Sequence, residues 1–151
     1  MEEDFLNDEY FMKQALEEAR KALAQDEVPV GAIVVANKQI IARAHNLTET
    51  LNDVTAHAEM QVITAATHFL GSKYLSDCSL YITLEPCVMC AGAIFWARPE
   101  KLIYAADDPK RGYSRYQIPL LHPATGVIKG LMSNESEILL KDFFRKKRKT
   151  I

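Results

Sequence analysis

Two short segments constrain this chain more than any other feature, because side chains far apart in the sequence suit a single metal ion. Residues 84–90 read Leu-Glu-Pro-Cys-Val-Met-Cys, and residues 55–59 read Thr-Ala-His-Ala-Glu. Two cysteines three positions apart can bind one zinc ion from the first turn of a helix, and a distant histidine can supply a third ligand. The pattern predicts a Zn²⁺ site made by His57, Cys87 and Cys90. Its open fourth position is typical of catalysis, with Glu59 placed to move protons.

The cysteines also admit two other interpretations. A redox Cys-x-x-Cys needs neither a histidine nor a glutamate, and usually accompanies a thioredoxin-like pattern that the sequence lacks. A closed Cys3His site with Cys78 as the fourth ligand would instead make the chain a non-catalytic, zinc-stabilised RNA-binding module. That alternative leaves Glu59 without a role. It also requires Cys78, at the entry to a predicted strand, to reach the helix that follows the strand.

Length and composition predict a single domain over residues 1–151. The chain is 48% hydrophobic, which is enough for one sizeable core and short for two. No stretch approaches the roughly 20 apolar residues that cross a bilayer, and residues 1–4 are acidic in net balance where a secretory signal would be basic. Together with an odd count of three cysteines, these features favour a cytoplasmic protein without a membrane association.

Charge is distributed unevenly along the chain. Residues 1–27 hold nine acidic and three basic side chains, whereas residues 141–151 hold six basic and one acidic. Such a basic run is either a solvated helix face or a phosphate-binding tail. Phe143 and Phe144 stand beside Arg145, so stacking faces and cations occur together, which favours the second interpretation.

Hydrophobic periodicity predicts an α/β sandwich, with helices on both faces of a mixed sheet of about five strands. Asn7 or Asp8 is available to cap the first helix, Thr55 the second, and Ser133 or Asn134 the last. Pro86 suits the first turn of the third helix. Helices are expected at residues 8–24, 56–70, 87–97 and 134–149, and strands at residues 28–35, 39–44, 79–84, 101–106 and 126–129, the first two strands forming a hairpin around residues 36–38.

The positions of His57 and Glu59 pose a geometric difficulty. In a regular helix, two residues separated by two positions point about 200° apart. The two side chains therefore converge only if the helix start is irregular or strongly tilted. Both metal-binding segments are predicted to begin helices, where free N–H groups and partial positive charge lower a thiol pKa.

Further segments accompany the two motifs and carry a resemblance to a known family. These segments are residues 27–32 (Glu-Val-Pro-Val-Gly-Ala), 44–46 (Ala-His-Asn), 55–60, 80–93, 108–112 (Asp-Pro-Lys-Arg-Gly) and 142–145 (Asp-Phe-Phe-Arg). With them, nearly the whole chain resembles the bacterial tRNA-specific adenosine deaminases, which have a cytidine-deaminase-like fold. A histidine-x-glutamate with Pro-Cys-x-x-Cys is the signature of zinc-dependent nucleobase deaminases in general.

The resemblance implies hydrolytic conversion of adenosine to inosine at the wobble position of a tRNA anticodon. Zinc held by His57, Cys87 and Cys90 would lower the pKa of its bound water. Glu59 would accept the water proton, deliver it to the ring nitrogen beside the attacked carbon and help the amine leave. The family implies a homodimer with an anticodon stem-loop crossing both subunits, and residues 91–96 are a candidate contact surface.

The same resemblance implies how the substrate is held. Asn46 would hydrogen-bond the base or a hydroxyl group of the flipped nucleotide. Val28 and Pro29 would line the pocket, and main-chain groups near Leu84, Glu85 and Cys87 would steady the substrate. The expected RNA contacts are completed by Asp108, Phe143, Phe144 and Arg145.

Two segments depart from the tRNA family. Residues 92–98 also resemble bacterial guanine deaminases, so a free-base deaminase acting on guanine or cytosine is the alternative function. In the loop after Ala106, the family often carries a basic residue where Asp107 stands and small residues where Tyr113 and Arg115 stand. The basic tail favours RNA, because a free-base enzyme has no need of it.

Overall fold

A five-stranded sheet forms the centre of the computed structural model, which describes residues 6–149. The strands lie in the order β2-β1-β3-β4-β5. β1 is antiparallel to β2 and β3, whereas β3, β4 and β5 are parallel to one another. This arrangement confirms the predicted mixed sheet. Their bounds are β1 Gly31–Ala36, β2 Gln39–His45, β3 Cys78–Leu84, β4 Lys101–Ala106 and β5 Gly126–Lys129.

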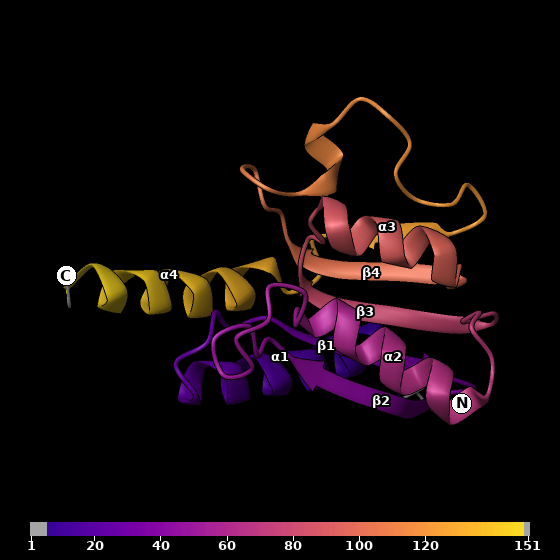
Figure 1. Ribbon diagram of the computed structural model, residues 1–151, viewed down its shortest axis with the longest axis horizontal. Coiled ribbons are helices and arrows are strands. Elements are labelled where there is room, and N and C mark those ends of the chain that lie inside the picture. Colours follow the sequence, from indigo (N-terminus) through magenta and orange to yellow (C-terminus); the bar gives the residue numbers. More distant parts are fainter. Residues whose placement is uncertain (1–5, 150–151) are drawn as a thin grey trace.

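Helices cover both faces of the sheet, which confirms the predicted three-layer α/β/α sandwich (Figure 1). The helices are α1 (Asp8–Ala24), α2 (Ala58–Leu70), α3 (Val88–Ala97) and α4 (Ser133–Lys149), with one 3-10 turn, η1 (Tyr113–Arg115). α2 and α3 pack on one face, and α1 packs on the other. The second half of α4 projects beyond the body of the molecule (Figure 1). None of the helices within residues 6–149 is long and apolar enough to cross a membrane.

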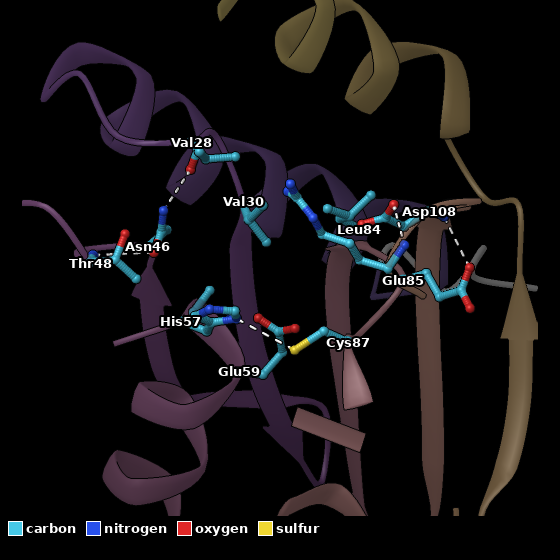
Figure 2. Close-up of a pocket in the computed structure, with 12 residues that line it drawn as sticks. Val28, Val30, Asn46, Thr48, His57, Glu59, Leu84, Glu85, Cys87 and Asp108 are labelled. Atoms are coloured by element: carbon cyan, nitrogen blue, oxygen red, sulfur yellow. Dashed lines mark hydrogen bonds between the residues drawn. The ribbon is translucent and has the colours of Figure 1, made fainter. Parts of the chain in front are cut away.

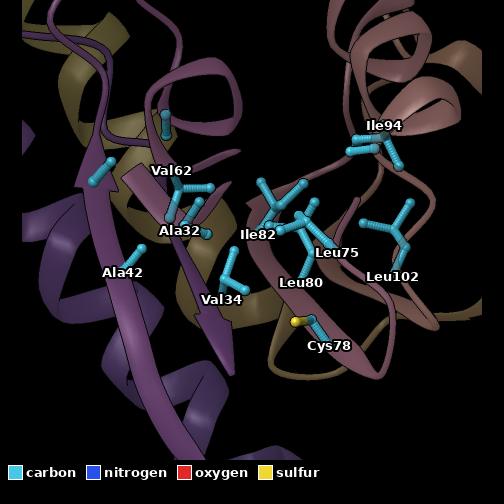
Figure 3. Packing of buried hydrophobic residues seen from close by; sticks show 14 of the residues in the cluster. Ala32, Val34, Ala42, Val62, Leu75, Cys78, Leu80, Ile82, Ile94 and Leu102 are labelled. Carbon is cyan, nitrogen blue, oxygen red and sulfur yellow. The ribbon is translucent and has the colours of Figure 1, made fainter. Parts of the chain in front are cut away.

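The core consists of two layers, because alternate strand residues point to opposite faces. Val62 of α2 and Ile94 of α3 pack against one face, where Leu80 and Ile82 lie (Figure 3). Tyr81, between them in sequence, joins Phe11 of α1 on the other face. The strands β1, β3 and β4 are buried on both faces. Such strands are apolar almost throughout, so polar and apolar residues alternate only weakly along them.

Helix α1 has the predicted bounds and the predicted cap. The Asn7 side chain accepts a hydrogen bond from the Tyr10 N–H at 2.9 Å. The helix crosses β1 at Gly31, where a Cβ would overlap the carbonyl oxygen of Ala15. A glycine is therefore required there by the close approach of the two backbones.

Strand β1 begins three residues later than the sequence predicts. Val28, Pro29 and Val30 form a tight turn instead, in which the Val30 N–H donates to the Val28 carbonyl oxygen at 2.8 Å. Pro29 has no N–H to offer a strand ladder. The ladder therefore starts at Gly31, which pairs with His45, one residue beyond the predicted end of β2.

Three predicted helix starts are also wrong. The Thr55 hydroxyl does not cap α2, because it donates to Asp53 at 2.7 Å. Pro86 lies before the first turn of α3, since Cys87 still has an extended backbone and bridges to Gly112. Ser133 lies inside α4, which follows a left-handed residue, Met132, at φ 60°.

Candidate metal centre and substrate pocket

His57 and Cys87 occupy equivalent positions, each directly before a helix at the same edge of the sheet. His57 precedes α2 with φ −69° and ψ 155°, and Cys87 precedes α3 with φ −74° and ψ 176°. A residue in this position has left the helical period. The His57 and Glu59 side chains therefore reach the same cavity despite their two-residue spacing (Figure 2).

Three potential ligand atoms gather where the two helix starts meet. Nδ1 of His57 is 3.8 Å from Sγ of Cys87 and 3.5 Å from Sγ of Cys90. All three atoms lie within 4.8 Å of one another, and residues 6–149 contain no other such group of His, Cys, Asp or Glu side chains. Three donors around one point suit a single metal ion.

The thiols and the imidazole perturb one another. A hydrogen bond from Cys90 lowers the pKa of the Cys87 thiol to about 4, and the neighbouring His57 lowers it further against the effect of burial. The pKa of Cys90 is raised, because its proton is held by Cys87 and its surroundings are buried. The hydrogen bond with Cys87 also raises the pKa of His57. The thiolate is the form of cysteine that binds metals, so the lowered pKa of Cys87 suits a metal ligand.

Glu59 presents a buried carboxyl group beside these ligands. The residue is 4% exposed, and burial raises the pKa of its carboxyl group to about 7, although the nearby His57 opposes this shift. The carboxyl group lies between His57 and Cys87 at the inner end of the cavity (Figure 2). A carboxyl group of this pKa can both accept and release a proton near neutral pH.

The cavity above Glu59 has a volume of about 180 Å³. Five of the nine predicted substrate residues line it. The tail residues Phe143, Phe144 and Arg145 do not, and neither does Pro29, because the turn at residues 28–30 buries it away from the cavity. Cys90 is fully buried behind the lining. Sequence reasoning missed four lining residues, Val30, Thr48, Ala58 and Arg111, and found eight: Val28, Asn46, His57, Glu59, Leu84, Glu85, Cys87 and Asp108.

Asn46 lies in the cavity wall with part of its hydrogen-bonding capacity already used. Its side-chain amide donates to the Val28 carbonyl oxygen at 3.4 Å and its oxygen accepts from the Thr48 N–H at 3.3 Å (Figure 2). These contacts hold the side chain at the cavity surface, where it is 7% exposed.

Glu85 holds one wall of the cavity. Its carboxylate accepts hydrogen bonds from the N–H groups of Asp108 at 3.0 Å and Ser114 at 2.8 Å. The backbone of Gly112 lies so close to the Glu85 carboxylate that a Cβ atom on residue 112 would overlap it. The sequence interpretation used only the main chain of Glu85. The side chain could have been singled out from the sequence, because Glu85 is a single charged residue between an apolar strand and a proline.

Glu27 holds the opposite wall, and sequence reasoning gave its side chain no role. The buried carboxylate accepts from the N–H groups of Glu49 at 3.0 Å and Thr50 at 2.6 Å, and from the Thr50 hydroxyl at 2.6 Å. Hydrogen bonds to the ionised form lower the pKa of Glu27 despite its burial. The loop that carries Asn46 and Thr48 is thereby fixed.

The predicted tail contacts differ in how accessible they are. Phe143 is only 7% exposed, so it packs against the body and does not present a free ring, whereas Phe144 is 40% exposed. Arg145 pairs with Asp142 at 2.7 Å, and Lys147 pairs with Asp26 at 2.6 Å, which fastens α4 to the end of α1. Residues 150–151 lie outside the described part of the chain.

Cys78 is too far from the ligand group to belong to it. It opens β3, whereas the cavity lies beyond Leu84 at the other end of that strand. Its thiol is 1% exposed and donates to the Ser76 carbonyl oxygen at 3.5 Å. This position contradicts the closed Cys3His alternative.

Comparisons with known proteins agree with this geometry. The family model of the MafB19-like deaminases matches residues 6–148. A tRNA-specific adenosine deaminase from Agrobacterium fabrum is 49% identical over 144 residues, which cover 92% of this chain and 95% of the relative.

Two solved structures are similar as well. One comes from a study of A-to-I editing by tRNA:A34 deaminases at the wobble position of transfer RNA. It has a TM-score of 0.81 and 48% identity, covering 87% of this chain and 99% of that one. A guanine deaminase from Bacillus subtilis has a TM-score of 0.65 and 46% identity, covering 67% of this chain and 65% of that one.

Proposed function

The chain belongs to the tRNA-specific adenosine deaminases, and we propose that it hydrolyses adenosine to inosine at the wobble position of a tRNA anticodon. The observation that carries this proposal is a buried carboxyl group, Glu59, placed between His57 and Cys87 at the inner end of a cavity. A hydrolytic deaminase needs such a group, because protons must be moved where bulk water is excluded.

We propose zinc as the metal. In a tetrahedral zinc site, typical bond lengths place a histidine nitrogen and a cysteine sulfur about 3.6 Å apart. The observed separations from Nδ1 of His57 are 3.8 Å to Cys87 and 3.5 Å to Cys90. One nitrogen and two sulfur donors also suit zinc better than magnesium or calcium, which prefer oxygen. Zinc bound there would supply a Lewis acid that activates water near neutral pH.

Glu59 is the proposed proton shuttle. It accepts a proton from the water that attacks C6 of adenine and delivers it to the adjacent ring nitrogen, N1. A second transfer through Glu59 moves the remaining proton of the added hydroxyl group to the exocyclic amino group, which leaves as ammonia, while the oxygen remains as the C6 carbonyl of inosine. The Glu59 side chain is almost fully buried, which keeps bulk solvent away from both proton transfers.

Four residues of the cavity wall are proposed to hold the base and its sugar. Asn46 and Asp108 offer polar side chains to the cavity, and Val28 and Leu84 offer apolar surface. Glu85 contributes by fixing the Asp108 loop, because both of its oxygens already accept main-chain hydrogen bonds.

Two features support an RNA substrate over a free purine. Arg111 is the only lysine or arginine among the lining residues that the structure describes, so the cavity itself carries a cation. In addition, α4 starts close to the site. The Ser136 hydroxyl, in the first turns of α4, donates to the carbonyl oxygen of Thr83 at 2.5 Å, and Thr83 lies two residues before Glu85 in the sequence. The basic second half of α4 then projects outward (Figure 1). We propose that Phe144 and Arg145 on this helix contact RNA.

A substrate panel tests this function directly. The purified protein should form inosine in an adenosine-containing anticodon stem-loop and release ammonia in equal amount, with little turnover of guanine, cytosine or free adenosine. The reason is that the flanking phosphates contribute binding that a free base lacks. Efficient turnover of guanine without inosine formation would instead assign the chain to the free-base deaminases, as the similarity to the Bacillus subtilis enzyme allows.

The tail can be tested without removing its anchor. Within residues 6–149, Lys146 and Arg148 are exposed and make no ion pair, whereas Lys147 pairs with Asp26 and holds α4 against the body. We expect Lys146→Gln with Arg148→Gln to weaken stem-loop binding and to lower the salt slope by about one to two units, since each phosphate contact contributes nearly one. Turnover at saturating substrate should not change.

The matched control for the tail is Lys101→Gln. This lysine opens β4, at the end of the strand opposite to the site, and is exposed. The substitution removes one positive charge at a position away from the residues proposed to contact RNA. Because the control removes one charge and the tail variant two, a loss of salt slope in the control half as large as in the tail variant would show that only the net charge matters, and would contradict the tail contact.

The remaining proposals concern assembly and location. We propose a single-domain subunit that forms a homodimer through α3, because Val88, Met89 and Trp96 of that helix are exposed, Trp96 to 68%. A solution mass of one 17.0 kDa chain at micromolar concentration would contradict it. The proposed location is the cytoplasm, where tRNA is found.

A further inference from the structure

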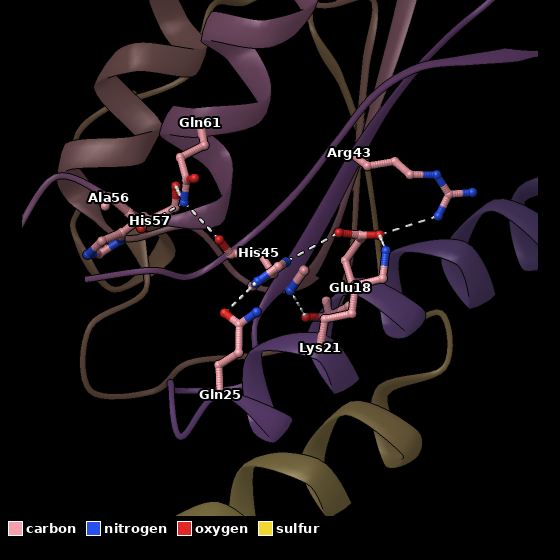
Figure 4. A network of polar contacts seen from close by, with 10 residues as sticks. Glu18, Lys21, Gln25, Arg43, His45, Ala56, His57 and Gln61 are labelled. Carbon is pink, nitrogen blue, oxygen red and sulfur yellow. Dashed lines mark hydrogen bonds and ion pairs between the residues drawn. The ribbon is translucent and has the colours of Figure 1, made fainter. Parts of the chain in front are cut away.

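The side chain of Gln61 lies where two segments of the site meet (Figure 4). Its amide nitrogen donates to the carbonyl oxygens of His45 at 2.7 Å and Ala56 at 3.0 Å. A third and longer contact, 3.5 Å, reaches the carbonyl oxygen of His57. An amide nitrogen has two N–H groups. The two shorter bonds account for both groups, and the third contact shares one of them.

Only a hydrogen-bond donor fits at this point. All three neighbours of the Gln61 nitrogen are carbonyl oxygens, so an oxygen in the same place would face oxygen on every side. The half-buried side chain is therefore held in one orientation. Replacing it removes a donor from carbonyl groups that are themselves partly shielded from water.

The two segments that Gln61 joins carry different functions in the proposed site. His45 directly precedes Asn46 in the cavity wall, and Ala56 directly precedes the ligand His57. One main-chain hydrogen bond, from the Leu47 N–H to the Ala56 carbonyl oxygen at 3.0 Å, also links them. The side chain of Gln61, in the first turn of α2, adds a second link between the same two segments.

On its other side, His45 is anchored to α1. Its ring nitrogens lie 3.4 Å from a carboxylate oxygen of Glu18 and 3.1 Å from the side-chain oxygen of Gln25 (Figure 4). Glu18 is 3% exposed and pairs with Lys21 at 2.7 Å and Arg43 at 3.5 Å. The end of β2 is thus fixed to α1, and Gln61 connects this fixed point to the metal ligand.

We propose that Gln61 is a positioning residue, which sets the distance between His57 and Asn46 and so between the metal centre and the base. The inference rests on the proposed deamination for its effect on turnover, but its effect on metal binding can be measured independently. Displacing a reacting group by about 1 Å can cost up to about 100-fold in rate. Partners that orient a metal ligand are worth about 10- to 100-fold in affinity.

Three variants separate shape from hydrogen bonding. Gln61→Met keeps the length and helix propensity but has no donor, and Gln61→Glu keeps the shape but presents an acceptor. Both should lower kcat/KM for the stem-loop about tenfold and accelerate zinc release to a chelator about tenfold. Gln61→Lys retains donors and should restore part of both losses.

Thr64→Ala is the control, because Thr64 lies one turn further along α2. The substitution removes a comparable hydrogen bond, from the Thr64 hydroxyl to the Met60 carbonyl oxygen at 3.0 Å. It should change neither measurement. If the Gln61 variants lower Tm but leave zinc release and kcat/KM as in the original protein, Gln61 merely stabilises the helix and the inference is overturned. If the unmodified protein forms no inosine, the proposed function fails, while zinc release still decides the role of Gln61.

Discussion

Glu59→Gln should lower kcat for inosine formation by about 10⁴-fold while the protein keeps its metal. A positioned acid or base contributes roughly 10² to 10⁴, and Glu59 is proposed to act in two successive transfers. An amide of the same shape can neither accept nor deliver the proton. The measurements are single-turnover kinetics on the stem-loop and metal content by atomic spectroscopy.

Two other carboxylates line the cavity, and both are engaged in hydrogen bonds. Glu85 uses both oxygens to hold the loop at Asp108 and Ser114, and Asp108 accepts from the Arg111 N–H at 3.1 Å. Glu49→Gln is the matched control, since it removes an exposed carboxylate from the loop beside the cavity. A Glu59→Gln protein within tenfold of normal activity would exclude the proposed proton shuttle, and one without metal would show that Glu59 is needed as a ligand.

Cys87→Ser and Cys90→Ser should each release the metal, with a loss of affinity above the roughly 100-fold that outer partners of a metal site contribute. Each change removes a sulfur donor from a group of three. A serine hydroxyl is a far poorer ligand for zinc than a thiolate. Competition with a chromogenic chelator measures the affinity, and deaminase activity should fall in parallel.

Cys78→Ser is the control for these two variants. Cys78 lies at the far end of β3, and its thiol donates to the Ser76 carbonyl oxygen, a bond that a hydroxyl group can also make. Metal content and activity should be retained, with a modest loss of stability from placing a hydroxyl group among apolar side chains. Loss of metal in this variant would return the closed Cys3His site to consideration.

Local patterns determined much of the fold. The bounds of α1, β4 and β5 follow from the sequence, because helical or strand periodicity and end signals lie within each element. The start of β1 does not, since it depends on a turn at Pro29 and on the passage of α1 over Gly31, two features that span both elements.

The chemistry of the site was also present in the sequence, as residue types and spacing. Histidine, two cysteines and a glutamate are sufficient to predict a metal and a proton shuttle, because few other arrangements use all four. Their distances and burial could not be predicted. His57 and Glu59 share a cavity only because His57 stands outside α2 with an extended backbone.

Only the tertiary structure assigned the residues that hold the site together. Glu27, Glu85 and Gln61 look like ordinary polar residues in the sequence, yet each bonds main-chain groups of another segment. Phe143 has the same sequence context as Phe144, but the first is buried and the second exposed. Such contacts join residues far apart in the chain, so no local periodicity records them. The sequence alone therefore determined which chemistry is available, and the packing of α1, α2 and the two loops decided where each group stands.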